Sequence, residues 1–433
     1  MNEKLNYYVI CPDCGREIEA MPFRRGNNEG SCAATGRTPV QYGEEYCENC
    51  GFPIALSNLT PVKQEHVFFA PGRLNLIGEH TDYNGGYVFP CSISLGTYGA
   101  IRKRKDEIAK FTSKNIGLTV ETDINKIIYD PAHGWANYPK AVAAELTKMG
   151  CRLGGFDLYV DGNLPSGAGL SSSASLELLT CTALNDIFGL GLSLIEMAQL
   201  CQRAENGFVG VNCGIMDQFA CGLGRKNQVI LLNCKTLNYE FVPLTMEGYK
   251  LIISNTNKQR GLENSKYNER RAECEQALAS LRTKLPIEAL CDITPALFEE
   301  HKHVIKDEVI LKRATHIIYE NARVLAAVDT LSKNDLFAFG ALMNESHISL
   351  RDLYEVTGTE LDTLAEAAWE TDGVLGSRMT GAGFGGCTVS LVAESETTSF
   401  IKKVGEIYKQ KTGLNADFYI AETGTGAGRI ASS

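Results

Sequence analysis

The stretch GRLNLIGEHTDYNGG, residues 72–86, places an arginine, two acids and a histidine around one short apolar run. Arg73 precedes that run, and Glu79, His80 and Asp82 follow it. Such groups could ligate a metal, act as an acid/base pair, bind the hydroxyls of a sugar, or form an ordinary polar turn. Residues 72–86 alone leave all four interpretations open.

The loop LPSGAGLSSSAS, residues 164–175, has the composition of a phosphate-binding loop. Gly167 and Gly169 allow a close approach of the backbone to a ligand, and three serines supply hydroxyl groups. A helix is expected directly after them, and its exposed amides and positive dipole end favour an anion. No lysine stands where a Walker loop requires one. The alternative is a flexible Gly/Ser turn, which the position between a strand and an apolar helix disfavours.

Two further segments are candidates for the same site. The segment AENGFVGVNCGIMDQFA, residues 204–220, sets Glu205 and Asp217 among small and apolar residues. A carboxylate in such surroundings either titrates abnormally or pairs with a cation. Asp217 could therefore accept a proton from a hydroxyl, or it could simply cap a turn. A second glycine loop, MTGAGFGGC at residues 379–387, is weak evidence alone because glycine-rich turns before strands are common.

The first fifty residues carry a different cysteine pattern from the rest of the chain. CPDCG (11–15) and CENCG (47–51) are two C-x-x-C knuckles with 32 residues between them. Four thiolates at this spacing, Cys11, Cys14, Cys47 and Cys50, suit tetrahedral Zn²⁺, with two disulfides as the alternative. Bound metal would supply stability that so small a segment cannot draw from its own core.

The composition bounds the possible functions. The net charge of −10 argues against a nucleic-acid groove as the main function, although local amides and Mg²⁺ could still bind an anion. No apolar run is long enough to span a membrane, and the first residues lack the apolar core of a secretory signal. A cytoplasmic location is therefore expected.

The elements that must position these loops alternate between strands and helices. Strands are expected around 66–80, 86–104, 118–123 and 155–165, and helices at 135–150, 173–188 and 193–209. Past residue 245 a new unit mixes strands with long helices. The pattern predicts an α+β fold of two lobes with a cleft between them.

Three of these segments, PGRLNLIGEHTDYNGG, LPSGAGLSSSAS and MTGAGFGGC, resemble the three motifs of the GHMP small-molecule kinases and occur in the same order. PGRLNLIGEHTDYNGG and GIMDQF are more specific and look like the galactokinases. The resemblance covers about residues 62–430, and the knuckle segment lies outside the usual galactokinase pattern. It implies a two-lobed GHMP kinase fold with the active site between the lobes, preceded by a small four-cysteine zinc-ribbon module. The expected boundaries are 1–57 for that module, 58–245 for the N-terminal kinase domain and 246–433 for the C-terminal one.

The resemblance also assigns roles to individual residues. Asp217 would be the base or orienter of the C1 hydroxyl of α-D-galactose, and Arg73 its electrostatic partner at the transferred phosphoryl group. The expected sugar contacts are Glu79, His80, Asp82, Gly214 and Tyr267. The expected ATP contacts are Gly167, Gly169, Leu170, Ser171, Ser172, Ser173, Ala174, Trp135 and Gly383. Ser172 and Glu205 would hold Mg²⁺. Trp135 could equally be a core aromatic.

The activity implied is ATP-dependent phosphorylation of galactose to galactose 1-phosphate. The alternatives are a related kinase acting on N-acetylgalactosamine, arabinose or galacturonate, or a kinase-like sugar sensor. The string HTDYNGG favours galactose. The intact loop of residues 164–175, called the serine loop from here on, favours catalysis over sensing, as do Arg73 and Asp217. Oligomeric state is not readable from the sequence.

Overall fold

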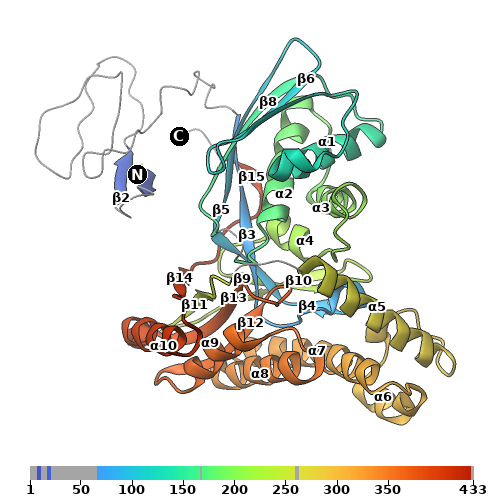
Figure 1. Ribbon diagram of the computed structural model, residues 1–433, viewed down its shortest axis with the longest axis vertical. Coiled ribbons are helices and arrows are strands. Elements are labelled where there is room, and N and C mark those ends of the chain that lie inside the picture. Colours follow the sequence, from blue (N-terminus) through green and yellow to red (C-terminus); the bar gives the residue numbers. More distant parts are fainter. Residues whose placement is uncertain (1–6, 11–16, 21–65, 166–167, 259–262, 431–433) are drawn as a thin grey trace, which may run out of the picture. The chain divides into compact units, whose positions relative to one another are not determined.

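The architecture is α+β, with two large sheets that are each covered by helices (Figure 1). The computed structural model describes residues 7–10, 17–20, 66–165, 168–258 and 263–430. Within it, residues 67–430 form one compact unit. The α+β expectation is confirmed.

A six-stranded sheet carries the N-terminal half of this unit. Its order is β15-β3-β5-β8-β6-β7, and only β6 and β8 run parallel. The strands are β3 (Val67–Asn75), β5 (Pro90–Lys103), β6 (Ile108–Ser113), β7 (Thr119–Asp123), β8 (Phe156–Gly162) and β15 (Gly428–Arg429). The outer strand β15 comes from the far end of the chain and pairs with β3. The expected boundary between the two kinase domains lies at residue 246, yet β15, which follows that boundary in the chain, belongs to the sheet of the N-terminal half.

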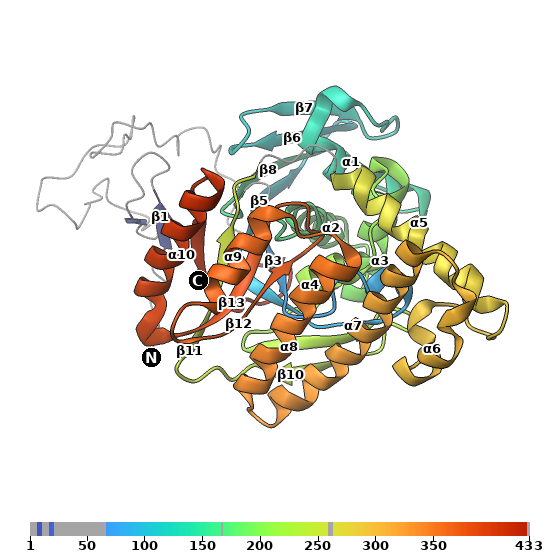
Figure 2. The same cartoon turned by 60° about the horizontal axis from the view of Figure 1, so that its bottom comes forward.

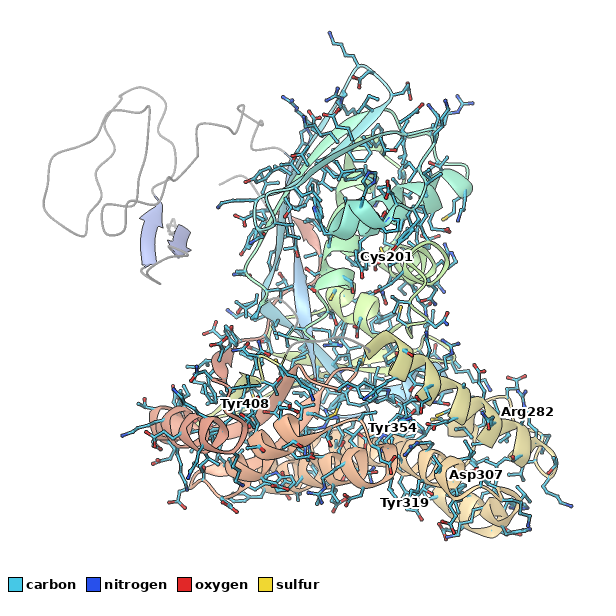
Figure 3. All side chains as sticks on the ribbon, viewed as in Figure 1. Cys201, Arg282, Asp307, Tyr319, Tyr354 and Tyr408 are labelled. Carbon is cyan, nitrogen blue, oxygen red and sulfur yellow. The ribbon has the colours of Figure 1, made fainter. Side chains whose placement is uncertain are left out.

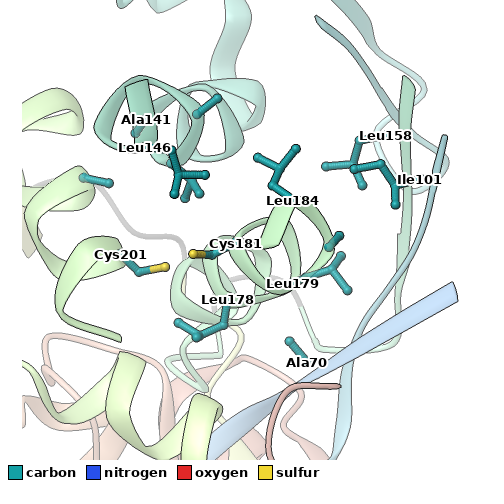
Figure 4. Close-up of a cluster of buried hydrophobic side chains, with 14 of the residues drawn as sticks. Ala70, Ile101, Ala141, Leu146, Leu158, Leu178, Leu179, Cys181, Leu184 and Cys201 are labelled. Atoms are coloured by element: carbon teal, nitrogen blue, oxygen red, sulfur yellow. The ribbon is translucent and has the colours of Figure 1, made fainter. Parts of the chain in front are cut away.

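Two helices of the N-terminal half, α2 (Ser172–Phe188) and α4 (Met216–Leu223), pack against this sheet through apolar faces. Two more, α1 (Asn137–Lys148) and α3 (Leu194–Ala204), pack on α2 and on each other. Figure 4 shows Leu178 and Leu184 of α2 in the core, where the thiols of Cys181 and Cys201 face each other. α3 begins at a capping box in which Ser193 and Glu196 satisfy each other's amides.

A three-stranded sheet and a four-stranded sheet complete the unit. The first is β10-β9-β4, made of β4 (Tyr87–Val88), β9 (Gln228–Asn233) and β10 (Tyr239–Pro243). The second is the antiparallel sheet β12-β13-β11-β14, made of β11 (Tyr249–Asn255), β12 (Val374–Thr380), β13 (Cys387–Ala393) and β14 (Asp417–Ala421).

The four-stranded sheet is contacted by three helices of the C-terminal half, α8 (Leu336–Ser349), α9 (Thr359–Trp369) and α10 (Thr397–Thr412) (Figure 2). The other three, α5 (Glu263–Arg282), α6 (Pro295–His301) and α7 (Glu308–Ser332), lie to one side, where α5 and α6 pack on α7 and α7 packs on α8. One apolar cluster contains Leu74 and Ile77 from the first half together with Phe339 and Val389 from the second. The halves therefore share a core, which holds the loops of both in a fixed relation.

The first 66 residues belong to a separate unit. Its described part is an antiparallel pair, β1 (Tyr7–Ile10) with β2 (Glu17–Ala20), in which Ile10 is opposite Glu17. The four predicted zinc ligands Cys11, Cys14, Cys47 and Cys50 lie outside the described residues. In the described part of the chain, no helix is long and apolar enough to cross a membrane.

Candidate active site

The centre of the site is an ion pair between β3 and the first turn of α4. Arg73 Nε lies 2.9 Å from Asp217 Oδ1, and Nη2 lies 3.1 Å from Oδ2, so the contact is bidentate. Arg73 is 3% exposed, whereas the Asp217 side chain is 29% exposed. Burial lowers the pKa of Arg73, but the negative charges of Asp217 and Glu79 outweigh this effect. The pKa of Arg73 is therefore raised overall, and the guanidinium stays charged. Asp217 thus presents an anchored carboxylate that a ligand can reach.

The serine loop lies directly over this pair. Arg73 Nη1 donates to the carbonyl oxygen of Gly169 at 2.6 Å, and its backbone amide donates to Leu170 at 3.2 Å. A Cβ on Gly72 would lie 2.6 Å from that same Leu170 oxygen, so only glycine allows the approach. The structure therefore brings Gly169 and Leu170 to the predicted catalytic arginine. Gly167 lies outside the described residues.

Helix α2 starts from this loop with its first turn uncapped. Ser171 is the N-cap at a φ of 60°, and its side chain makes no capping hydrogen bond. Its buried hydroxyl has no hydrogen-bond partner among the described residues. Free amides at the positive end of a helix dipole bind phosphate well. Ala174 is buried in the same turn, and Ser175 anchors it by donating to the Ala70 carbonyl at 2.7 Å.

Glu205 is the second buried carboxylate of the site. It begins the π-helix η5 (Glu205–Val209) and is 5% exposed. Burial raises the pKa of Glu205 to about 7, and the charge of Asp217 adds to the rise, while hydrogen bonds from Ser173, Cys213 and Gln218 oppose it. Ser173 is thus the serine that bonds Glu205, whereas the predicted metal ligand Ser172 is exposed at the start of α2.

Glu79, the first of the predicted sugar contacts, lies in a network of hydrogen bonds. Glu79 is buried, and both of its oxygens accept hydrogen bonds, Oε2 from Asn75 Nδ2 at 2.7 Å and Oε1 from the Gly381 amide at 2.8 Å. Its Oε1 also lies 3.3 Å from Arg378 Nη1. The structure therefore joins Glu79 to the second glycine loop, residues 379–387.

His80 lies in an aromatic wall. Its backbone is left-handed at a φ of 65°, and its Nδ1 lies 2.9 Å from the Tyr83 hydroxyl. The ring centroid of Tyr267, from α5, is 5.6 Å away. Burial and His316 lower the pKa of His80 to about 3, so the ring is neutral. Its Nε2 is buried without a partner among the described residues, which leaves a polar atom for a ligand hydroxyl.

The aromatic wall continues into the C-terminal half. The Tyr83 hydroxyl lies 2.8 Å from that of Tyr354, which ends the π-helix η8 (Leu350–Tyr354). Tyr354 is fully buried and is labelled in Figure 3. This contact fixes the orientation of His80 through a second residue.

Asp82 faces Gly214 at very short range. A Cβ on Gly214 would lie 1.7 Å from Asp82 Oδ2, so a side chain there would displace the carboxylate. Burial and the charge of Asp217 raise the pKa of Asp82 to about 7. Both residues line a polar cavity of about 290 Å³. The predicted sugar contacts Asp82 and Gly214 are therefore neighbours, close to Asp217.

Two predicted ATP contacts, Trp135 and Gly383, form no hydrogen bond with the Arg73–Asp217 pair in the described part of the chain, and packing accounts for their surroundings. Trp135 packs partly buried against the first core, and its Nε1 has no partner among the described residues. Gly383 is at a φ of 82°, and a Cβ there would lie 2.3 Å from the Val356 oxygen, which accounts for the glycine without a ligand. Gly381 instead approaches the serine loop, since its Cβ would lie 3.0 Å from the Gly169 oxygen.

The structure adds residues that the sequence did not single out. Gln218 and Glu177 are fully buried beside Glu205, and Arg378 is fully buried beside Glu79. Gln218 lies inside a segment already of interest, and Arg378 directly precedes another, but only the three-dimensional contacts reveal their partners. In the described ranges, no group of three or more His, Cys, Asp or Glu side chains could hold a metal ion.

Three family models match this chain in order. They are the galactokinase galactose-binding signature at residues 60–103, the GHMP kinase N-terminal domain at 137–225 and the GHMP kinase C-terminal domain at 327–410. A mevalonate kinase structure at 19% identity, with a TM-score of 0.58, shares the fold over 83% of this chain and 99% of its own. The fold and the three loops thus define a GHMP kinase.

Relatives of higher sequence identity show which family of GHMP kinases this chain belongs to. A galactokinase of Fusobacterium nucleatum is 55% identical over 84% of this chain and 94% of its own length, and one of Bacillus subtilis is 51% identical over 83% and 93%. The crystal structure of Lactococcus lactis galactokinase complexed with galactose is 47% identical, with a TM-score of 0.83, and covers 85% of this chain and 96% of its own. The chain belongs to the galactokinase family.

Proposed function

We propose that this chain transfers the γ-phosphoryl group of ATP to the C1 hydroxyl of α-D-galactose. The observation that carries the proposal is the Arg73–Asp217 pair beneath the Gly169 carbonyl, which puts a partly exposed carboxylate beside the phosphate-type loop. The likeness to a galactose-bound galactokinase at 47% identity supports the choice of sugar.

Each side chain has a definable part in that reaction. Asp217 accepts or orients the proton of the attacking hydroxyl, and Arg73 balances charge where the phosphoryl group passes. The Nε2 atom of His80 and the carboxyl group of Asp82 face the sugar. Tyr267 and Gly214 shape the wall beside them. Glu79 acts mainly by holding the second glycine loop, and its remaining lone pairs are available to a hydroxyl.

The donor set beside the serine loop fits Mg²⁺. Glu205 is a buried carboxylate that forms no ion pair with any Lys, Arg or His among the described residues, and Ser173 bonds it. Mg²⁺ commonly takes one or two protein oxygens and completes its shell with phosphate and water. When bound with ATP, the ion would neutralise developing phosphate charge. Glu205 with Ser173, or Ser172 beside it, would hold the ion.

The decisive experiment is a coupled ADP-release assay of the full chain with a panel of sugars. We expect galactose to give the highest kcat/KM, and N-acetylgalactosamine, arabinose and galacturonate to give far lower values, because a misplaced hydroxyl leaves buried groups unpaired. Preference for one of those sugars would assign a related kinase. Binding of galactose without turnover on any sugar would assign a sensor.

We also propose that residues 1–57 hold one structural Zn²⁺ through Cys11, Cys14, Cys47 and Cys50. The support is the antiparallel pairing of β1 with β2, because these strands flank the first knuckle in the chain. Elemental analysis of protein purified without chelator should give one zinc per chain, and Cys11→Ser with Cys14→Ser should lose it. The half-buried Cys151→Ser is the matched control. A metal-free wild type would contradict the proposal.

A further inference from the structure

We propose that Gln218 is a positioning residue that orients Glu205 toward Mg²⁺, and that Glu177 holds the Gln218 amide in place. The inference rests on the proposed function, because it takes Glu205 as the metal ligand. Its new content is that the residue after the catalytic aspartate sets the metal affinity.

The contacts of Gln218 are short and fully buried. Its Nε2 donates to Glu205 Oε2 at 2.7 Å and to Glu177 Oε2 at 3.3 Å. Gln218 and Glu177 have no exposed surface, and Glu205 has 5%. The amide group carries two N–H donors, so one can donate to Glu205 and the other to Glu177. The opposite amide orientation would place an oxygen against both carboxyl groups, so the orientation with both donors inward is the one that suits them when they are ionised.

Two of the hydrogen bonds on Glu205 converge on one of its oxygens, while Ser173 of the serine loop also bonds this carboxyl group. Gln218 at 2.7 Å and the Cys213 thiol at 3.5 Å both donate to Oε2. We therefore assign Oε1 as the oxygen that would bind the ion. A carboxylate held at one oxygen keeps its plane, which is how outer partners of metal ligands act in general.

The network is poorly arranged for stability alone. Glu177 Oε1 and Gln218 Oε1 are both buried without a hydrogen-bond partner among the described residues. Glu177 also forms no ion pair with a cation in the described part of the chain. Unsatisfied buried polar atoms are costly, and they concentrate where function requires them. A purely structural core at this position would be better served by apolar side chains.

The position of Gln218 in the chain links the metal to the base. Gln218 directly follows Asp217 on α4, and Asp217 is held on the other side by Arg73. One helical turn therefore presents the base toward the sugar and the amide toward Glu205. A shift of α4 would move both groups together.

The test uses Gln218→Met, which keeps the length of the side chain but removes both donors. Binding of Mn²⁺ to the full-length protein with ADP is measured by electron paramagnetic resonance, with Mn²⁺ as the probe for the metal site. We expect the Mn²⁺ affinity to fall by about 10- to 100-fold. Galactose binding without nucleotide, measured by calorimetry, should stay within about twofold, because the sugar wall keeps its contacts.

The matched control is Gln199→Met. Gln199 is a half-buried glutamine on α3 that makes no side-chain hydrogen bond in the described residues, so Mn²⁺ affinity should be unchanged. Glu177→Met is the second variant, since it frees the amide to rotate without removing it. It should weaken Mn²⁺ binding less than Gln218→Met does, and it carries the test if Gln218→Met does not fold.

The outcomes separate this inference from the proposed function. Folded Gln218→Met with wild-type Mn²⁺ affinity would overturn the positioning role while leaving the kinase assignment intact. Absence of Mn²⁺ binding in the wild-type protein with ADP would instead count against the proposed metal site. Equal loss of Mn²⁺ and galactose binding in Gln218→Met would show a general structural effect and would also overturn the inference.

Discussion

The Oε1 atom of Glu79 accepts a hydrogen bond from the backbone amide of Gly381 at 2.8 Å, across 302 positions of the chain. This hydrogen bond thus connects the first motif to the second glycine loop. Arg378 reinforces this contact from the strand that leads into the loop, with Nη1 3.3 Å from the same oxygen. Glu79 therefore receives a donor from the loop and another from the strand before it.

Arg378→Met should destabilise the protein strongly. Arg378 is fully buried, and its Nη1 also donates to the carbonyl oxygens of Asn75 and Leu76 at 3.1 and 3.3 Å. Removing it leaves Glu79 as a buried carboxylate without its cation, which costs about 3–5 kcal/mol. Urea unfolding measures the loss. Arg429→Met, at a surface pair with Asp186, is the control and should cost at most about 1 kcal/mol.

Asp217→Asn should lower kcat by about 10²- to 10⁴-fold, which is the usual contribution of a positioned base. Asparagine keeps an oxygen toward Arg73 Nε and avoids the folding cost of a truncation. Affinity for ATP should stay close to that of the wild type, because the serine loop keeps its contact with Arg73. Single-turnover kinetics and calorimetry test both parts, with Asp186→Asn as a surface control. A variant with full turnover would remove Asp217 from the catalytic role.

The stability of the ligand-free protein should respond to pH through Glu205. Its pKa is raised from 4.5 to about 7 by burial and by Asp217. The folded state therefore holds the proton more tightly than the unfolded state. The resulting stability is fully present below about pH 4.5 and is lost as the pH rises through about 7.

Glu205→Gln removes this titration and tests its sign. Between pH 4.5 and 7.5, the wild type should lose up to about 3 kcal/mol relative to the variant, in urea unfolding without nucleotide or metal. Parallel stability curves for the two proteins would contradict the assignment. The same variant should fail to bind Mn²⁺ with ADP, because its amide carries no charge.

Gly214→Ala should raise the KM for galactose and leave the KM for ATP nearly unchanged. The added Cβ would lie 1.7 Å from Asp82 Oδ2, so the carboxylate must leave its place in the sugar wall. Gly428→Ala is the matched control, because no atom lies within 4 Å of its Cβ position. Equal effects on both KM values would show that the loop as a whole had moved.

The elements and the loops of the site were predictable from the sequence because their signals are local. The glycines and serines of residues 164–175 sit between a strand and an apolar helix, and the capping box at Ser193 marks the start of α3. These features depend on neighbours within a few residues. The order of the motifs then identified the family.

Other details depend on geometry that the sequence does not carry. Ser172 and Ser173 are adjacent, and a helix turns by about 100° per residue, so only the phase set at Ser171 decides which one bonds Glu205. Gly381 and Gly383 share one glycine-rich loop, yet only Gly381 approaches the serine loop. Arg378 and Glu79 meet across 299 positions, so no local pattern could pair them.

The pairing of β15 with β3 has a consequence for how the protein is made. β3 carries Arg73, and its outer neighbour follows the entire C-terminal half in the chain. During synthesis, the part of the β3 edge at Phe68 and Phe69 therefore has no partner strand until nearly all of the protein has been made. Open strand edges recruit other chains. A chain that ends before Gly428 would therefore leave Phe68 and Phe69 without this partner strand.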